Sequence, residues 1–167
     1  MKVVDLFSGL GGFSAGAIAA GAEVTLGVDH DPVPLKLWGA NVSGARAFLS
    51  SLGPSGDDVS LPPPHLHIHA STPCTDLSPA RGRSATPADV ASGVGMLRWA
   101  LDLVLERGDY SFSLENVSTP KTREVLADYA ARFPEKVAFA TLDAADFGSP
   151  QTRIRLIAGP PALVKLL

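Results

Sequence analysis

The stretch DLFSGLGG, residues 5–12, decides the fold because it joins a short apolar run to a run of small residues. The apolar run, residues 2–6, is typical of a buried strand. Residues 12–20 are small and mostly apolar, and Gly21 behind them is a common stop signal for a helix. A strand that turns through glycines into a helix starts a parallel α/β unit, and the glycines let the backbone come close to a ligand.

Outward from this turn, predicted strands and helices alternate along the chain. Further strands are expected at residues 23–28, 65–70, 111–114, 136–142 and 152–158, and further helices at 32–40, 87–107 and 121–132. Residues 43–64 are expected to form a loop with one helical turn at 45–52. Strands that alternate with helices need crossover connections, so the sequence predicts an α/β fold with a mostly parallel central sheet and helices on both faces.

Length and composition limit the classes of protein that this chain can be. Its 167 residues suit one domain with a sizeable core. The formal net charge of -3 excludes a domain that holds nucleic acid by bulk positive charge, so such contact needs a local patch or a partner. The single cysteine excludes an internal disulfide and a cysteine-rich zinc site, which fits a reducing compartment such as the cytoplasm, nucleoid or nucleus. No apolar run is long enough to span a bilayer, so no membrane partner is expected.

The glycines of residues 5–12 and an acidic residue behind them predict a nucleoside cofactor. Gly9, Gly11 and Gly12 lead into a helix start whose free amide hydrogens can bind an anion or a carboxylate. Asp29 closes the expected second strand 20 residues after Gly9 (29 − 9), where a carboxylate accepts hydrogen bonds from a ribose. The spacing is G-x-G-G rather than G-x-G-x-x-G, which favours S-adenosylmethionine over a nicotinamide cofactor. The alternative is that the glycines serve only tight packing of the helix against the strand.

Four segments occur in order along most of the chain, namely DLFSGLGG at 5–12, PCTDLS at 73–78, ENV at 115–117 and QTRIR at 151–155. Together they resemble the cytosine-5 DNA methyltransferase family. The resemblance implies a Rossmann-like, S-adenosylmethionine-dependent methyltransferase fold. As function it implies transfer of a methyl group from S-adenosylmethionine to carbon 5 of a cytosine flipped out of DNA, through a covalent adduct at carbon 6. Relatives directed to tRNA share this core, so tRNA stays as the alternative substrate.

The same segments supply the groups that this chemistry needs. Carbon 5 of cytosine is a poor nucleophile until a thiolate adds to carbon 6, which is the role implied for Cys74. A carboxyl that is partly protonated must place a proton or a strong hydrogen bond on N3 of the ring, and Glu115 is the candidate. The resemblance implies that Arg155 holds the base and that Arg153, on the same face of the expected strand, supports it. A solvated strand face is the alternative for the two arginines.

The resemblance also assigns cofactor and substrate contacts. The cofactor is expected to lie among residues of the glycine turn and of three later segments: Phe7, Ser8, Gly9, Leu10, Gly11, Gly12, Asp29, His30, Pro73 and Met96. Residues 76–87 are similar to a mobile loop that closes on the substrate, although a solvated loop is the alternative. Substrate binding is assigned to Ser78, Arg81, Arg83, Asn116 and Gln151, with Asn116 also supporting the loop that carries Glu115.

Three histidines stand apart from this chemistry. His65, His67 and His69 alternate along an expected strand and share one face, which is a spacing that can bind zinc. Because the implied reaction needs no metal, no metal site is expected.

The sequence departs from the family in two places. An acidic residue that binds the adenine amine is usual near the end of the third strand, but residues 43–52 contain none, and only a shifted alignment brings Asp57 or Asp58 there. Family members continue beyond the Arg-x-Arg strand into a target-recognition domain, whereas this sequence ends at Leu167. We therefore expect residues 1–167 to be a single catalytic domain without that domain, with DNA and a second chain that supplies target recognition as partners. A catalytically inactive S-adenosylmethionine-binding module is the alternative of another class.

Overall fold

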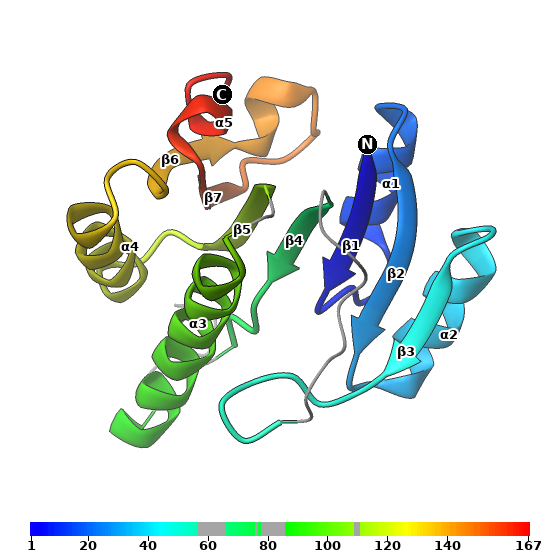
Figure 1. The fold of residues 1–167 in the computed structure, drawn as a ribbon, viewed down its shortest axis with the longest axis horizontal. Helices are drawn as coiled ribbons and strands as arrows, with labels where there is room; N and C mark the ends of the chain where they lie inside the picture. Colours follow the sequence, from blue (N-terminus) through cyan, green and yellow to red (C-terminus); the bar gives the residue numbers. More distant parts are fainter. Residues whose placement is uncertain (57–65, 76, 78–85, 109–110) are drawn as a thin grey trace.

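The computed structural model describes residues 1–56, 66–75, 77, 86–108 and 111–167, which form one sheet with helices on both faces (Figure 1). The strands are β1 (Lys2–Leu6), β2 (Glu23–Asp29), β3 (Arg46–Leu49), β4 (His67–Ser71), β5 (Ser111–Val117), β6 (Ala138–Asp143) and β7 (Ile154–Gly159). The helices are α1 (Gly12–Ala19), α2 (Pro32–Asn41), α3 (Pro87–Arg107), α4 (Pro120–Arg132) and α5 (Pro161–Val164), with a 3-10 turn, η2, at Ala144–Phe147. Across the sheet the strands follow the order β3-β2-β1-β4-β5-β7-β6.

The direction of β7 decides where the late arginine segment lies. β1 pairs in parallel with β2 and with β4. The pair of β2 with β3 and the pair of β4 with β5 are also parallel. β7 instead runs antiparallel to both β5 and β6. Its first residues therefore lie beside the last residues of β5, with Arg155 paired to Val117. This reversal brings Arg155 to the edge where the parallel strands end, which is where open α/β sheets bind ligands.

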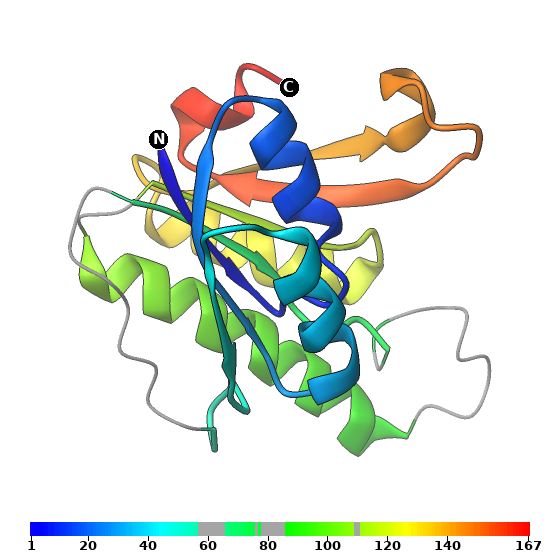
Figure 2. The same ribbon diagram turned by 90° about the vertical axis from the view of Figure 1, so that its right-hand side faces the viewer.

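Each face of the sheet has its own apolar core. In Figure 2, α1 and α2 lie in front of the sheet, and α3 and α4 lie behind it. Val3 faces the front and packs with Val24, Trp38 and Val42, while its neighbour Val4 belongs to the core behind the sheet. That larger core is built from alternate strand residues and from α3 and α4, including Leu6, Ile68, Leu97, Leu101, Leu114 and Leu126. The alternation of side chains along each strand separates the two cores.

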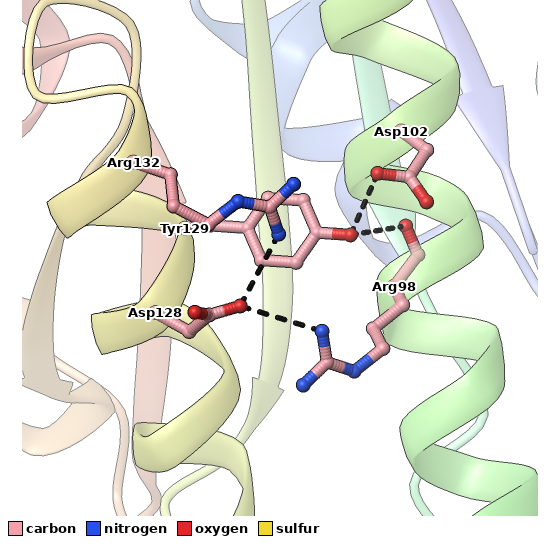
Figure 3. Close-up of polar contacts among 5 residues, drawn as sticks. All are labelled: Arg98, Asp102, Asp128, Tyr129 and Arg132. Carbon is pink, nitrogen blue, oxygen red and sulfur yellow. Dashed lines mark hydrogen bonds and ion pairs between the residues drawn. The ribbon is translucent and has the colours of Figure 1, made fainter.

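A polar cluster joins α3 to α4 (Figure 3). Tyr129 of α4 donates a hydrogen bond to Asp102 Oδ1 of α3 at 2.6 Å, and its hydroxyl lies 3.5 Å from the carbonyl oxygen of Arg98. Asp128 Oδ2 lies 3.4 Å from Arg98 Nη1 and 3.3 Å from Arg132 Nη1. Burial of the ring, together with the bond to Asp102, raises the pKa of Tyr129 to about 12. The cluster fixes α4, which follows β5, against the long helix α3.

The mostly parallel α/β fold expected from the sequence is confirmed, with two local corrections. Residues 45–52 do not form a helical turn, because Arg46–Leu49 is strand β3 and pairs with β2. The backbone hydrogen bonds offered by β2 outweigh the local helical preference of this short segment. The last strand begins at Ile154 rather than at residue 152, so Arg153 precedes the strand that contains Arg155. Within the described residues, no helix is long and apolar enough to cross a membrane.

Candidate active site

The turn between β1 and α1 is ordered by Asp29 at the end of β2. Asp29 Oδ2 accepts a hydrogen bond from Gly9 N at 2.8 Å, and its Oδ1 accepts one from Asp31 N at 2.9 Å. Gly11 adopts a φ of 94°, and a Cβ there would lie 2.9 Å from Trp38 Cδ1, so a larger residue would collide with the indole. The carboxylate expected to hold a ribose therefore also fixes the shape of the glycine turn.

A buried carboxyl lies beneath this turn. Asp5 is 1% exposed and accepts a hydrogen bond from Ser14 Oγ at 2.5 Å. Ser14 Oγ in turn accepts one from Trp38 Nε1 at 2.9 Å. Burial raises the pKa of Asp5 to about 6, and the bond from Ser14 partly opposes that rise. Asp5 thus ties β1 to α1 and α2 through a chain of hydrogen bonds.

A hollow of about 320 Å³ lies at the ends of β1, β2 and β3, lined by Phe7, His30, Ser50, Ser51, Leu52, Pro73, Thr75 and Met96. The structure thus brings together four residues that the sequence assigned to the cofactor. Ser50, Ser51 and Leu52 were missed because the segment after β3 was expected to be helical, and Thr75 lies in the loop after β4, next to the motif that was assigned to the nucleophile. Residues that follow a strand in such a sheet are natural ligand contacts. The other six residues assigned to the cofactor are not among the lining residues: Ser8, Gly9, Leu10, Gly11, Gly12 and Asp29. Of these, Leu10 is 64% exposed and Gly12 opens α1.

Ser8 leaves a hydrogen-bonding group unused beside Phe7. The residue is 7% exposed, and its hydroxyl has no hydrogen-bond partner within the described part of the chain. A buried hydroxyl without a partner is costly, because it has lost water and gained nothing in return. The glycine turn therefore fits a ligand that supplies a polar group to Ser8.

A second hollow, of about 370 Å³, holds the predicted acid and both predicted arginines. It is lined by Glu115, Leu142, Ala144, Phe147, Ser149, Arg153, Arg155 and Ile157. Arg155 Nε lies 2.7 Å from Glu115 Oε1, and Arg155 Nη1 donates to the carbonyl oxygen of Ile154 at 2.8 Å. Arg153 is exposed and holds its place through a backbone bond from its N–H to Asp143 Oδ1 at 2.8 Å. Gln151 is exposed and is not among the residues that line this hollow.

The loop that carries Cys74 is tied to β5 by Asn116. Asn116 Nδ2 donates to Thr72 Oγ1 at 2.7 Å and to the carbonyl oxygen of Thr72 at 3.3 Å, two residues before the half-buried Cys74. Its Oδ1 accepts from Val117 N at 2.7 Å. Because Asn116 is 2% exposed and its amide is engaged, the geometry favours its supporting role over direct contact with a substrate. The remaining substrate residues, Ser78, Arg81 and Arg83, lie outside the described residues, as do His65, Asp57 and Asp58.

The sequence and the geometry both agree with one family model. Residues 1–158 match the family described as C-5 cytosine-specific DNA methylase. The chain belongs to this family. The C-5 cytosine-specific DNA methylase match covers the glycine turn, the Cys74 loop, Glu115 and both arginines in one continuous alignment.

Curated relatives of this methylase chain are bacterial type II methyltransferases. The chain is 30% identical to M1.HphI of Haemophilus parahaemolyticus over 94% of its own length and 45% of that protein. It is 30% identical to M.HindV of Haemophilus influenzae, over 93% of the chain and 51% of that protein. The chain therefore spans about half the length of the curated relatives it matches.

Solved structures give the same fold at lower sequence identity. A DNA modification methyltransferase encoded within an E. coli prophage aligns over 99% of this methylase chain and 48% of its own, with a TM-score of 0.63 and 23% identity. A DNMT2 variant of Spodoptera frugiperda aligns over 95% of the chain and 49% of its own, with a TM-score of 0.64 and 17% identity. The shared architecture is the Rossmann-like methyltransferase fold.

Proposed function

We propose that this chain carries the catalytic centre of a DNA (cytosine-5)-methyltransferase, which transfers a methyl group from S-adenosylmethionine to carbon 5 of a flipped-out cytosine. The observation that carries the proposal is the 2.7 Å ion pair between Glu115 of β5 and Arg155 of β7, because β5 also pairs with β4, the strand that leads into the Cys74 loop. The Glu115 carboxyl can donate a proton to N3 of a cytosine, and the Arg155 guanidinium can donate hydrogen bonds to the carbonyl oxygen of the base.

The residues around the glycine turn fit S-adenosylmethionine. Asp29, which holds the glycine turn, is the proposed acceptor for the ribose hydroxyls, and Ser8 has a buried hydroxyl without a hydrogen-bond partner in the described part of the chain. Phe7, His30, Pro73 and Met96 line one hollow, and His30 would be the residue that stacks on the adenine there. When bound there, S-adenosylmethionine supplies an activated methyl group on a sulfonium.

The residues of the chain then divide the chemistry among them. The Cys74 thiolate forms a bond to carbon 6, which pushes electron density toward carbon 5. Glu115 gives a proton to N3, and Arg155 holds the ring and offsets the charge of the carboxylate that remains. Once carbon 5 carries the methyl group, its proton would pass to solvent water and the Cys74 thiolate would leave carbon 6, which restores the double bond between carbons 5 and 6. N3 would return its proton to Glu115.

DNA is the proposed substrate, and a second polypeptide is the proposed source of target recognition. The formal net charge of -3 supports this proposal, because a chain with that balance does not bind DNA through bulk positive charge.

The test is covalent trapping on DNA in which cytosine is replaced by 5-fluorocytosine. Fluorine at carbon 5 cannot leave as a proton does, so the Cys74 adduct should persist and shift the protein on a denaturing gel. We expect an adduct that needs both Cys74 and S-adenosylmethionine and that is absent from Cys74→Ser. A parallel arm with tRNA that contains 5-fluorocytidine separates the two substrate classes.

Three outcomes overturn parts of this proposal. An adduct on tRNA alone replaces DNA by RNA as substrate. Binding of S-adenosylmethionine in a calorimeter without any adduct makes the chain a cofactor-binding module. An adduct that survives in Cys74→Ser removes the nucleophile assignment.

A further inference from the structure

Five side chains on β4 and β5 form an unbroken hydrogen-bonded ladder that the proposed chemistry does not use. Ser111 Oγ lies 2.9 Å from His67 Nδ1, and His67 Nε2 lies 2.8 Å from Ser113 Oγ. Ser113 Oγ lies 2.8 Å from His69 Nδ1, and His69 Nε2 lies 2.9 Å from Ser71 Oγ. The ladder runs along one face of the sheet toward the ends of the parallel strands.

Both imidazoles of the ladder are neutral and held in place. His67 is 5% exposed and His69 is 4% exposed, and burial lowers the pKa of His67 to about 4 and of His69 to about 3. The Phe13 ring stacks on the His69 ring at 3.5 Å with an interplanar angle of 6°. All four ring nitrogens are bonded to serine hydroxyls, which leaves none for a metal, and no group of metal ligands occurs within the described residues.

A ladder in which the central serine, Ser113, donates to one imidazole puts both histidines in the same tautomer. A neutral imidazole has one N–H donor and one bare nitrogen, and a hydroxyl has one proton to donate. Ser113 has a single proton, so it can donate to only one of its two imidazoles, and when it does so it accepts from the other. If His67 carries its proton on Nε2, so does His69, and Ser71 accepts. If both carry it on Nδ1, Ser71 donates to His69.

The last rung of the ladder faces the proposed acid. Ser71 on β4 is the register partner of Glu115 on β5, just as His69 is the partner of Ser113, so all four side chains share one face. Neighbouring strands lie about 4.8 Å apart, which brings a serine hydroxyl within reach of a glutamate side chain on the same face. Among the residues that the structure describes, the charged or titratable groups that face Glu115 are Arg155 and Arg153 in its hollow and His69 behind Ser71.

We propose that Ser71 is a positioning residue for Glu115, and that the imidazole ladder fixes whether its hydroxyl donates to that carboxyl or accepts from it. The proposal rests on the role of Glu115 in the proposed function and adds a second polar partner to Arg155. The ladder sets an orientation rather than conducting protons. If a proton passed along the ladder, the His69 ring would have to rotate before the next proton could follow. The stacked Phe13 ring opposes that rotation.

The experiment is nitrogen-15 NMR of the histidines in the full chain at neutral pH. Nitrogen shifts report the tautomer of each ring directly. The variants are Glu115→Gln, Ser71→Ala and the two combined, with Ser111→Ala at the exposed far end of the ladder as the matched control. Thermal unfolding of each variant checks that it folds. Ser113→Ala is a further variant, which removes the central hydroxyl of the ladder.

We expect His67 and His69 to share one tautomer. Glu115→Gln should move the His69 resonances in the wild-type and Ser111→Ala backgrounds, and at least about threefold less in Ser71→Ala, since the coupling runs through that hydroxyl. Ser71→Ala should also slow adduct formation about tenfold while its affinity for S-adenosylmethionine is kept, as expected for loss of a group that orients the acid.

Different tautomers in the two rings would overturn the ladder. A response of His69 to Glu115→Gln that is equal with and without Ser71 would overturn the contact with Glu115. The tautomers and the response of His69 are measured without turnover, so these two results are independent of the trapping experiment. A wild-type chain that forms no adduct is therefore a failure of the proposed function alone.

Discussion

Arg155 Nε lies 2.7 Å from Glu115 Oε1, although the two residues come from different segments of the family pattern. Both side chains are partly buried, with 21% and 24% of their surfaces exposed. The pair forms because β7 runs antiparallel to β5 and starts where β5 ends. The proposed proton donor and the proposed base-binding cation are thus a single unit, and each can be tested through the other.

Arg155→Ala is expected to lower the rate of adduct formation with 5-fluorocytosine DNA by roughly 10- to 100-fold, because charge-assisted hydrogen bonds contribute about 1.5–3 kcal/mol. Arg153→Ala is the matched control, since that side chain is exposed, and its loss should stay below about tenfold. Equal losses in single-turnover assays of the two variants would contradict the distinct role of Arg155.

Asn116→Ala is expected to reduce the free energy of unfolding by about 1–3 kcal/mol, because it leaves the buried Thr72 without its amide partner. The Cys74 loop should loosen, so alkylation of Cys74 by iodoacetamide should become faster. Asn41→Ala, at the exposed end of α2, should change stability by less than about 0.5 kcal/mol. Unchanged alkylation in a destabilised Asn116→Ala would show that Asn116 stabilises the sheet without ordering the loop.

Asp29→Asn is expected to weaken binding of S-adenosylmethionine by about tenfold or more, measured by calorimetry. An amide has one accepting oxygen, so it cannot keep the bonds from both Gly9 N and Asp31 N. Asp31→Asn is the control, because asparagine caps a helix as well as aspartate does, and its affinity should stay within about twofold. Equal affinities of the two variants would remove Asp29 from the cofactor site.

Asp5 should make stability depend on pH. Its pKa is raised from 3.8 to about 6 in the folded chain, so its contribution is fully present below pH 3.8 and is lost as pH rises through 6. That difference corresponds to at most about 3 kcal/mol. In urea titrations at acidic and neutral pH, Asp5→Asn should lose less stability across this range than wild type. Asp146→Asn, which is exposed in η2, should behave as wild type does.

Tyr129→Phe should change the alkaline limit of stability. The pKa of Tyr129 is raised from 10.0 to about 12, so its contribution is present below pH 10 and disappears as pH rises through 12. Phenylalanine should lower stability by about 1 kcal/mol at neutral pH, through loss of the bond to Asp102, and should flatten the alkaline decline. A decline of equal steepness in the melting temperatures of both proteins would contradict this.

The sequence by itself determined the α/β alternation, the glycine turn and which residues are proposed as the reactive groups. These features can be read directly along the chain: the glycines, Asp29 at the end of a strand, and the order of Cys74, Glu115 and Arg155. Residues 45–52 show where this fails, because whether that segment becomes a strand depends on the edge that β2 offers.

Only the tertiary structure decided what the polar side chains of the strands do. His67 and His69 have a spacing that suits zinc, yet the register of β4 with β5 sets Ser111 or Ser113 beside three of their ring nitrogens, and Ser71 of β4 itself meets the fourth. Arg153 and Arg155 are two residues apart, yet Arg153 lies before β7, whereas Arg155 lies in β7 and forms an ion pair with Glu115. Register and strand direction are set by contacts between segments far apart in the chain, and a hydrogen-bonding group takes its role from the partner those contacts bring to it.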